Sequence, residues 1–156
     1  MPLEVGDSLP PVSVIATNGQ RFELANLIGT PVVIYFYPKD ATPGCTTEAQ
    51  NFRDLMPEFE RQGCKIFGVS RDSLNAHEKF KANECLPFEL ISDPDETLCQ
   101  LFDVIQLKNM YGKQVLGIER STFLFNAQGQ LQQEWRKVKV PNHASAVLAA
   151  VKGHRP

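Results

Sequence analysis

Residues 31–46 read PVVIYFYPKDATPGCT, and they join an almost wholly apolar segment to the start of an amphipathic one. Residues 31–37 are apolar on both faces, which is typical of a central strand that is covered on each side of its sheet. From Thr42, which suits the N-cap position, apolar residues recur at helical spacing until Gly63. The stretch predicts a buried strand followed by a helix of about four to five turns, at roughly 3.6 residues each.

The cysteine of this stretch, Cys45, falls in the first turn of the expected helix. A thiolate there faces unpaired backbone N–H groups and the positive end of the helix dipole, and both favour the anion over the thiol. A cysteine within a helix is usually a small buried apolar residue. The residues around Cys45 favour a reactive thiol instead.

Length and composition indicate one globular domain over residues 1–156. The chain is 42% apolar and 22% charged, with a formal net charge of −2. It therefore lacks both the basic surface of a nucleic-acid-binding protein and the low apolar content of a disordered one. No stretch approaches the ~18 apolar residues that a membrane span needs. Because the N-terminus shows no export signal, we expect a cytoplasmic protein without a membrane partner.

The cysteines and histidines show no metal-binding or dithiol spacing. No two cysteines form a C-x-x-C pair of the zinc or thioredoxin type. Cys64 and Cys99 lie in apolar surroundings and are expected to fill the core. The three histidines are expected on the surface, and they are His77, His143 and His154.

The remaining pattern alternates strands and helices without a repeat or a linker. The predicted elements are a hairpin about the turn at 18–19, a strand at 65–70, a helix at 73–84, a strand at 88–91, strands at 121–125 and 131–137, and a helix at 142–151. Strand, helix and strand in succession imply a parallel pair with a crossover. A βαβ half followed by a ββα half is the order of the thioredoxin-like α/β fold, with a mixed sheet flanked by helices.

The spacing Pro38-x-x-x-Thr42-x-x-Cys45 resembles the active-site signature of peroxiredoxins. The longer run FYPKDATPGCTTEAQNFRD, residues 36–54, is similar to the bacterioferritin-comigratory (Q-type) class, and the similarity continues through 68–73, 90–99 and 109–125. This resemblance implies a thiol-specific peroxidase that reduces hydrogen peroxide and organic hydroperoxides in antioxidant defence.

The resemblance also implies a role for each residue of the expected site. Cys45 would be the peroxidatic nucleophile and would pass through a sulfenic acid. Thr42 would present its hydroxyl to the peroxide or the sulfur, and Pro38 would shield the pocket from water. Arg120 would supply a fixed positive charge, and Glu48, one turn after Cys45, would hold that arginine.

The chain departs from the class at the residue that would regenerate the thiol. The commonest Q-type pattern has its resolving cysteine five residues after the peroxidatic one, where this chain has Gln50, and a second subgroup has it near Lys81. Cys85 lies one helical turn beyond Lys81 and could form a disulfide with Cys45 after local unfolding. The alternative is a one-cysteine cycle in which thioredoxin, glutaredoxin or glutathione reduces the sulfenic acid directly.

The chemistry requires no metal, haem, flavin or nicotinamide, and the sequence has no glycine-rich nucleotide loop. The resemblance favours a monomer. Two other functions share a thiol at a helix start. A cysteine hydrolase needs a histidine base, and none accompanies the segments around Cys45 or Arg120. A non-enzymatic thiol sensor or holdase on the same fold would be oxidised with little turnover.

Overall fold

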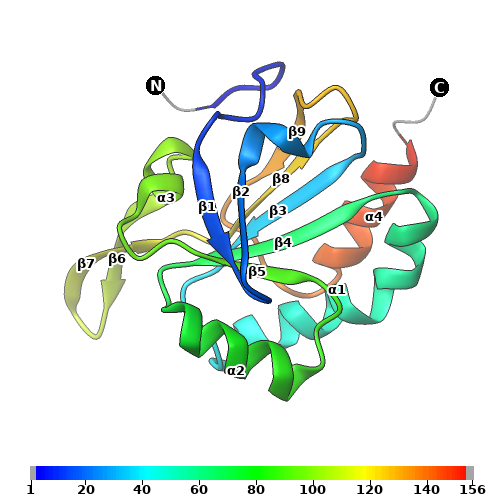
Figure 1. The fold of residues 1–156 in the computed structure, drawn as a ribbon. Coiled ribbons are helices and arrows are strands. Elements are labelled where there is room, and N and C mark those ends of the chain that lie inside the picture. The colour runs from blue at the N-terminus through cyan, green and yellow to red at the C-terminus, as the bar shows by residue number, and fades with distance from the viewer. Residues whose placement is uncertain (1–2, 154–156) are drawn as a thin grey trace.

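The computed structural model describes residues 3–153, and a seven-stranded mixed sheet forms its centre (Figure 1). The strand order is β2-β1-β5-β4-β3-β8-β9. These strands are β1 (Ser13–Ala16), β2 (Gln20–Glu23), β3 (Val32–Phe36), β4 (Lys65–Ser70), β5 (Glu89–Ser92), β8 (Ser121–Phe125) and β9 (Leu131–Trp135). The other elements are η1 (Leu24–Leu27), α1 (Pro43–Arg61), α2 (Leu74–Glu84), α3 (Thr97–Leu101), α4 (His143–Gly153) and a separate hairpin of β6 (Ile105–Met110) and β7 (Lys113–Ile118).

Strand β3 lies inside the sheet, as its apolar sequence predicts. It pairs in parallel with β4 and antiparallel with β8, and all of its residues are buried. Val33 and Tyr35 face the core beneath α1, α2 and α4, whereas Ile34 and Phe36 face the core that includes α3. Both faces of β3 are therefore covered, and the thioredoxin-like α/β fold is confirmed.

Most of the predicted elements are confirmed with small shifts at their ends. Strand β4 has the predicted bounds, and α1 begins at Pro43 and ends at Arg61, just before Gly63. The hairpin β6–β7 and the short helix α3 were not predicted. In Figure 1 the hairpin projects from the body of the molecule, below α3. No helix in the described part of the chain is long and apolar enough to cross a membrane.

The prediction that the histidines lie on the surface is wrong for two of them. His77 is fully buried and His143 is 7% exposed. The ring of His143 packs edge-on against Phe52 and shares a hydrogen bond of 2.8 Å with the Thr122 hydroxyl. Burial lowers the pKa of His143 to about 4. His154 lies outside the described residues.

Candidate active site

Cys45 is the third residue of α1 and is only 1% exposed. Thr42 occupies the N-cap position with extended backbone, and Pro43, which has no N–H group, follows it. The first backbone hydrogen bond of the helix runs from the N–H of Thr46 to the carbonyl of Thr42, at 2.8 Å. The N–H groups of Gly44 and Cys45 precede that bond and are available to an anion at this end of the helix.

The Arg120 guanidinium joins the thiol to a buried carboxyl group. Its Nη2 lies 3.4 Å from the Cys45 sulfur, and its Nη1 donates to Oε1 of Glu48 at 2.6 Å. Gly44 makes room for this approach, because a Cβ at that position would lie 3.3 Å from Nη2. The sulfur therefore faces both a helix start and a fixed cation, and both favour the thiolate.

Glu48 is 1% exposed, and its environment is unusual for a carboxyl group. Burial raises its pKa to about 7, although Arg120 acts in the opposite direction. Its second oxygen, Oε2, is buried and has no hydrogen-bond partner among the described residues. The carboxyl group thus orients the guanidinium without being fully satisfied itself.

Thr42 and Pro38 both lie in the loop that precedes α1. Thr42 occupies the N-cap position as predicted, but its hydroxyl donates to the carbonyl of Lys39 at 2.8 Å and makes no capping hydrogen bond to the helix. With its proton used in the loop, the hydroxyl oxygen can still accept a hydrogen bond. Pro38 is partly exposed and lies two residues after the end of β3.

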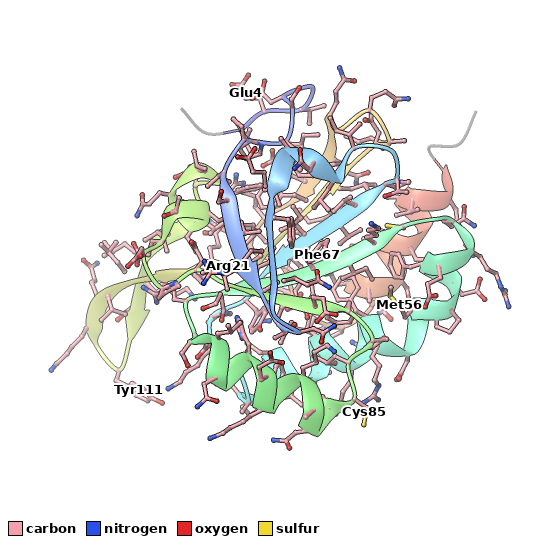
Figure 2. The ribbon with its side chains drawn as sticks, viewed as in Figure 1. Glu4, Arg21, Met56, Phe67, Cys85 and Tyr111 are labelled. Carbon is pink, nitrogen blue, oxygen red and sulfur yellow. The ribbon has the colours of Figure 1, made fainter. Side chains whose placement is uncertain are left out.

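Cys85 lies at the C-terminal end of α2, with its side chain at the surface (Figure 2). This end of α2 packs against α1 farther along than Cys45. Gln50 donates to the Glu84 carboxyl group at 2.8 Å, and Arg53 donates to the Glu84 carbonyl at 2.9 Å. Gln50 is five residues beyond Cys45, a distance of about 7.5 Å along a helix axis. The structure therefore leaves Cys45 and Cys85 as separate free thiols.

Cys64 and Cys99 are buried, which confirms that they belong to the core. Burial raises the pKa of the Cys64 thiol to about 12. Burial, followed by the nearby Asp93 carboxylate, raises the pKa of Cys99 still further above its ordinary value. Neither thiol is suited to attack a substrate at neutral pH.

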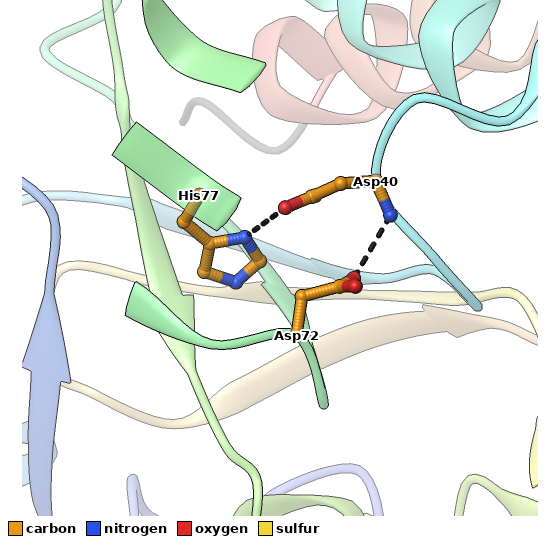
Figure 3. A group of neighbouring side chains, drawn as sticks. All are labelled: Asp40, Asp72 and His77. Carbon is orange, nitrogen blue, oxygen red and sulfur yellow. Dashed lines mark hydrogen bonds and ion pairs between the residues drawn. The ribbon is translucent and has the colours of Figure 1, made fainter. Parts of the chain in front are cut away.

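A second polar cluster adjoins the same loop and consists of Asp40, Asp72 and His77 (Figure 3). Each residue offers one atom that could bind a metal, and these three atoms lie within 4.8 Å of one another. Both ring nitrogens of His77 are already hydrogen-bonded, to Asp40 and to the carbonyl of Ile91. One feature of the sequence is consistent with this burial, because His77 lies three residues before the buried Phe80 on one helix face.

Comparison with known proteins gives consistent matches over most of the chain. Residues 5–134 match the AhpC/TSA family. The chain is 59% identical over 138 residues to peroxiredoxin Bcp of Xanthomonas campestris, covering 88% of this chain and 86% of that one. It is 45% identical to peroxiredoxin Bcp of Bacillus subtilis over 152 residues, 97% of each chain.

Solved structures of similar proteins have the same fold. A Xanthomonas campestris peroxiredoxin Q structure matches with a TM-score of 0.90 and 55% identity, over 97% of this chain and 96% of that one. A trapped intermediate/ligand complex of the bacterioferritin comigratory protein from the same organism, described for its alkyl peroxide reduction activity, matches equally well, over 97% of each chain. Two related structures carry serine in place of cysteine at positions 48 and 84 of the Xanthomonas protein.

These matches agree with the geometry around Cys45, where a buried thiol, a helix start and a guanidinium meet. The similarity extends over nearly the whole length of both this chain and its relatives. The chain therefore belongs to the AhpC/TSA family and, within it, to the Bcp/PrxQ class of peroxiredoxins, which are thiol peroxidases.

Proposed function

We propose that Cys45 is the peroxidatic cysteine and that it reduces hydrogen peroxide and organic hydroperoxides. The thiolate attacks one peroxide oxygen in line with the O–O bond. An S–O bond forms as the O–O bond breaks, the sulfur is oxidised to a sulfenic acid, and the departing oxygen takes a proton to leave as water or an alcohol. The observation that supports this most strongly is the 3.4 Å contact between the Cys45 sulfur and Arg120.

In this proposal the neighbouring groups each act on a stated atom. Arg120 stabilises the thiolate and, with its remaining N–H groups, the charge that develops on the departing oxygen. Glu48 holds the guanidinium through its 2.6 Å hydrogen bond. Thr42 accepts a hydrogen bond from the peroxide through its hydroxyl oxygen, and Pro38 limits the access of water to the pocket.

Two routes can return the sulfenic acid to the thiol. In the two-cysteine route Cys85 attacks the sulfenic sulfur, water leaves, and the resulting disulfide is reduced by an external dithiol. In the Xanthomonas structures the two substituted cysteines are 36 residues apart, and the same separation from Cys45 falls at Lys81. Cys85 would therefore act from a displaced position, after the first turn of α1 and the end of α2 unwind.

In the one-cysteine route an external thiol such as thioredoxin, glutaredoxin or glutathione reduces the sulfenic acid. This route does not involve Cys85, whose neighbour Glu84 contacts Gln50, and it needs only enough opening around the buried Cys45 to admit the external thiol. Thioredoxin or a similar thiol donor is the proposed reductant in both routes. The monomeric state and the cytoplasmic location remain predictions from the sequence.

Mass spectrometry after one equivalent of hydrogen peroxide, without reductant and with a sulfenic-acid trap, tests the proposal. Trapping on Cys45, or a disulfide that includes Cys45, supports its peroxidatic role. A loss of two hydrogens that maps to Cys45–Cys85 supports the two-cysteine route, and Cys85→Ser should then accumulate the trapped form. Oxidation at Cys64 or Cys99 with Cys45 unchanged would contradict the proposal.

A non-enzymatic thiol sensor or holdase would also be oxidised at Cys45 in that experiment. Steady-state turnover separates the two functions, because an enzyme consumes many equivalents of peroxide for each protein molecule when thioredoxin and its reductase are present. The expected result is continuous turnover that depends on Cys45. Consumption that stops after one equivalent would favour the sensor.

A further inference from the structure

His77 ties three separate segments of the chain together from the interior. Its ring is fully buried, with Nδ1 2.6 Å from Oδ2 of Asp40 and Nε2 2.9 Å from the carbonyl oxygen of Ile91 (Figure 3). Asp40 belongs to the loop before α1, His77 to α2, and Ile91 to β5. One side chain therefore fixes the loop that leads to Cys45 against both a helix and the sheet.

Both ring nitrogens of His77 have a hydrogen-bond partner. A carbonyl oxygen only accepts, so Nε2 of His77 carries a hydrogen. Nδ1 of His77 shares a hydrogen bond of 2.6 Å with the Asp40 carboxyl group. The other Asp40 oxygen accepts from the Tyr37 hydroxyl, also at 2.6 Å. Breaking the pair would leave buried polar groups unsatisfied, which is costly in the interior.

The backbone of Asp40 is fastened as well as its side chain. Its N–H donates to Oδ2 of Asp72 at 2.8 Å, and that carboxyl group also accepts from the Ser70 hydroxyl at 2.6 Å. Ala41, the next residue, has left-handed backbone with a φ of 61°, and Thr42 follows. The turn that delivers Thr42 and Cys45 is therefore held by contacts with the end of β4 and with α2, not by α1 alone.

We propose that His77 is a positioning residue for the peroxidase reaction. Through Asp40 it holds the loop that presents Thr42 and the first turn of α1, and so keeps Cys45 in the geometry that attack on a peroxide requires. This inference rests on the proposed role of Cys45. In this role His77 affects the reaction through Asp40 and does not contact the substrate.

The hydrogen-bonded pair of His77 and Asp40, here called the clamp, should have opposite effects on two reactions of Cys45. Hydrogen peroxide is small and reacts with Cys45 in the folded loop, where the loop and Arg120 are in place. Iodoacetamide is larger, and because Cys45 is only 1% exposed it reacts when the first turn opens. Loss of the clamp should therefore slow oxidation by peroxide and speed alkylation.

The test compares three variants with the wild-type protein in single-turnover experiments. His77→Leu and Asp40→Ala should each slow the oxidation of Cys45 by about tenfold or more, because the reacting groups are misplaced, while alkylation of Cys45 becomes faster. Asp40→Asn should behave like the wild-type protein, since its amide can donate to Nδ1 of His77 and its oxygen can accept from Tyr37.

Thr17→Val is the matched control. Thr17 is fully buried, and its hydroxyl is hydrogen-bonded to Glu89 and to the N–H of Leu90 in β5. This variant loses buried hydrogen bonds near α2 without altering the loop, so both rates should stay at their wild-type values.

The clamp would be overturned if oxidation and alkylation of Cys45 both became slower in His77→Leu and Asp40→Ala. It would also be overturned if both reactions kept their wild-type rates in these two variants. If His77→Leu does not fold, the comparison of Asp40→Ala with Asp40→Asn decides the question. Failure of the proposed function itself would be seen separately, as a wild-type protein whose Cys45 is not oxidised by peroxide.

Discussion

Cys45 and Cys99 occupy equivalent places in their helices and have opposite surroundings. Each is the third residue of a helix, α1 or α3, and each is almost completely buried. At α3 the Asp93 carboxylate accepts from the N–H groups of Leu98 and Cys99, at 3.1 and 2.8 Å. The helix start is thus already neutralised by an acid, which also raises the pKa of the Cys99 thiol in addition to the effect of burial.

At α1 no acid in the described part of the chain accepts from the backbone N–H groups of the first turn, and a guanidinium lies 3.4 Å from the sulfur. The carboxyl group one turn beyond this thiol, Glu48, is bound to that guanidinium instead of to backbone N–H groups. A helix N-terminus alone therefore does not make a thiol reactive. The two thiols are similarly buried, and they differ in the charge beside the sulfur, which is a guanidinium at Cys45 and a carboxylate at Cys99.

The largest expected difference is in turnover. Cys45→Ser should abolish peroxidase activity, because no other described cysteine combines a helix start with a cation, whereas Cys99→Ser and Cys64→Ser should leave it nearly intact. Steady-state peroxide consumption with a thioredoxin system measures all three. If Cys45→Ser retained more than about a tenth of the activity, the nucleophile would lie elsewhere.

Removal of the cation should make Cys45 more like Cys99. Arg120→Ala should slow oxidation by peroxide by about 100-fold, the usual cost of losing one preorganised donor at a reacting centre. It should also move the midpoint of the pH dependence of Cys45 alkylation to higher pH. Arg120→Lys keeps the charge but loses the forked geometry, so its oxidation rate and its alkylation midpoint should lie between those of the wild-type protein and Arg120→Ala. An unchanged midpoint in Arg120→Ala would refute the role of the guanidinium in stabilising the thiolate.

Replacement of the carboxyl group beside Cys45 should change how stability depends on pH. The folded-state pKa of Glu48, about 7, is above the ordinary value of 4.5, so its contribution to stability is complete below about pH 4.5 and is lost as the pH rises through 7. Glu48→Gln has no such loss. From pH 4.5 to pH 8 the variant should gain stability relative to the wild-type protein, by at most about 3 kcal/mol.

Urea unfolding of both proteins at pH 5 and pH 8 measures this relative gain. His143 is present in both proteins and cancels in the comparison, although its lowered pKa makes each of them less stable as the pH falls below about 6.5. Equal differences between the two proteins at both pH values would show that Glu48 is ionised throughout.

The elements that were predicted correctly are those whose local sequence decides their structure. Strand β3 is a continuous apolar run, β4 has an apolar centre at 66–69, and α1 is bounded by Pro43 and Gly63. The hairpin β6–β7 has no continuous apolar run. Its residues Leu107 and Leu116 pair across the two strands and are 58% and 65% exposed. Because these apolar residues are exposed, the sequence of the hairpin has neither the pattern of a buried strand nor that of a polar loop.

The candidate site was predictable only as far as its motif extends. The run around Cys45 and the position of Arg120 indicated the thiol and its cation, 75 residues apart in sequence. The burial of His77 depends on Asp40 and Ile91, which are 37 and 14 residues away. The only local signal was its spacing from Phe80 on one helix face, and a polar residue that is buried through distant partners was therefore expected on the surface.

Removal of the acid beside Cys99 tests the comparison from its other side, with the smallest expected effect. Asp93→Asn keeps one acceptor for the N–H groups of α3 and should lower the melting temperature by a few degrees, equivalent to about 1 kcal/mol. It should not make Cys99 reactive, because burial is the main cause of its raised pKa and no cation replaces the acid. Asp95→Asn, an exposed neighbour, is the matched control and should alter neither property. Native-state alkylation followed by peptide mapping measures the outcome, and rapid labelling of Cys99 in Asp93→Asn would mean that the acid alone, not the missing cation, keeps that thiol inert.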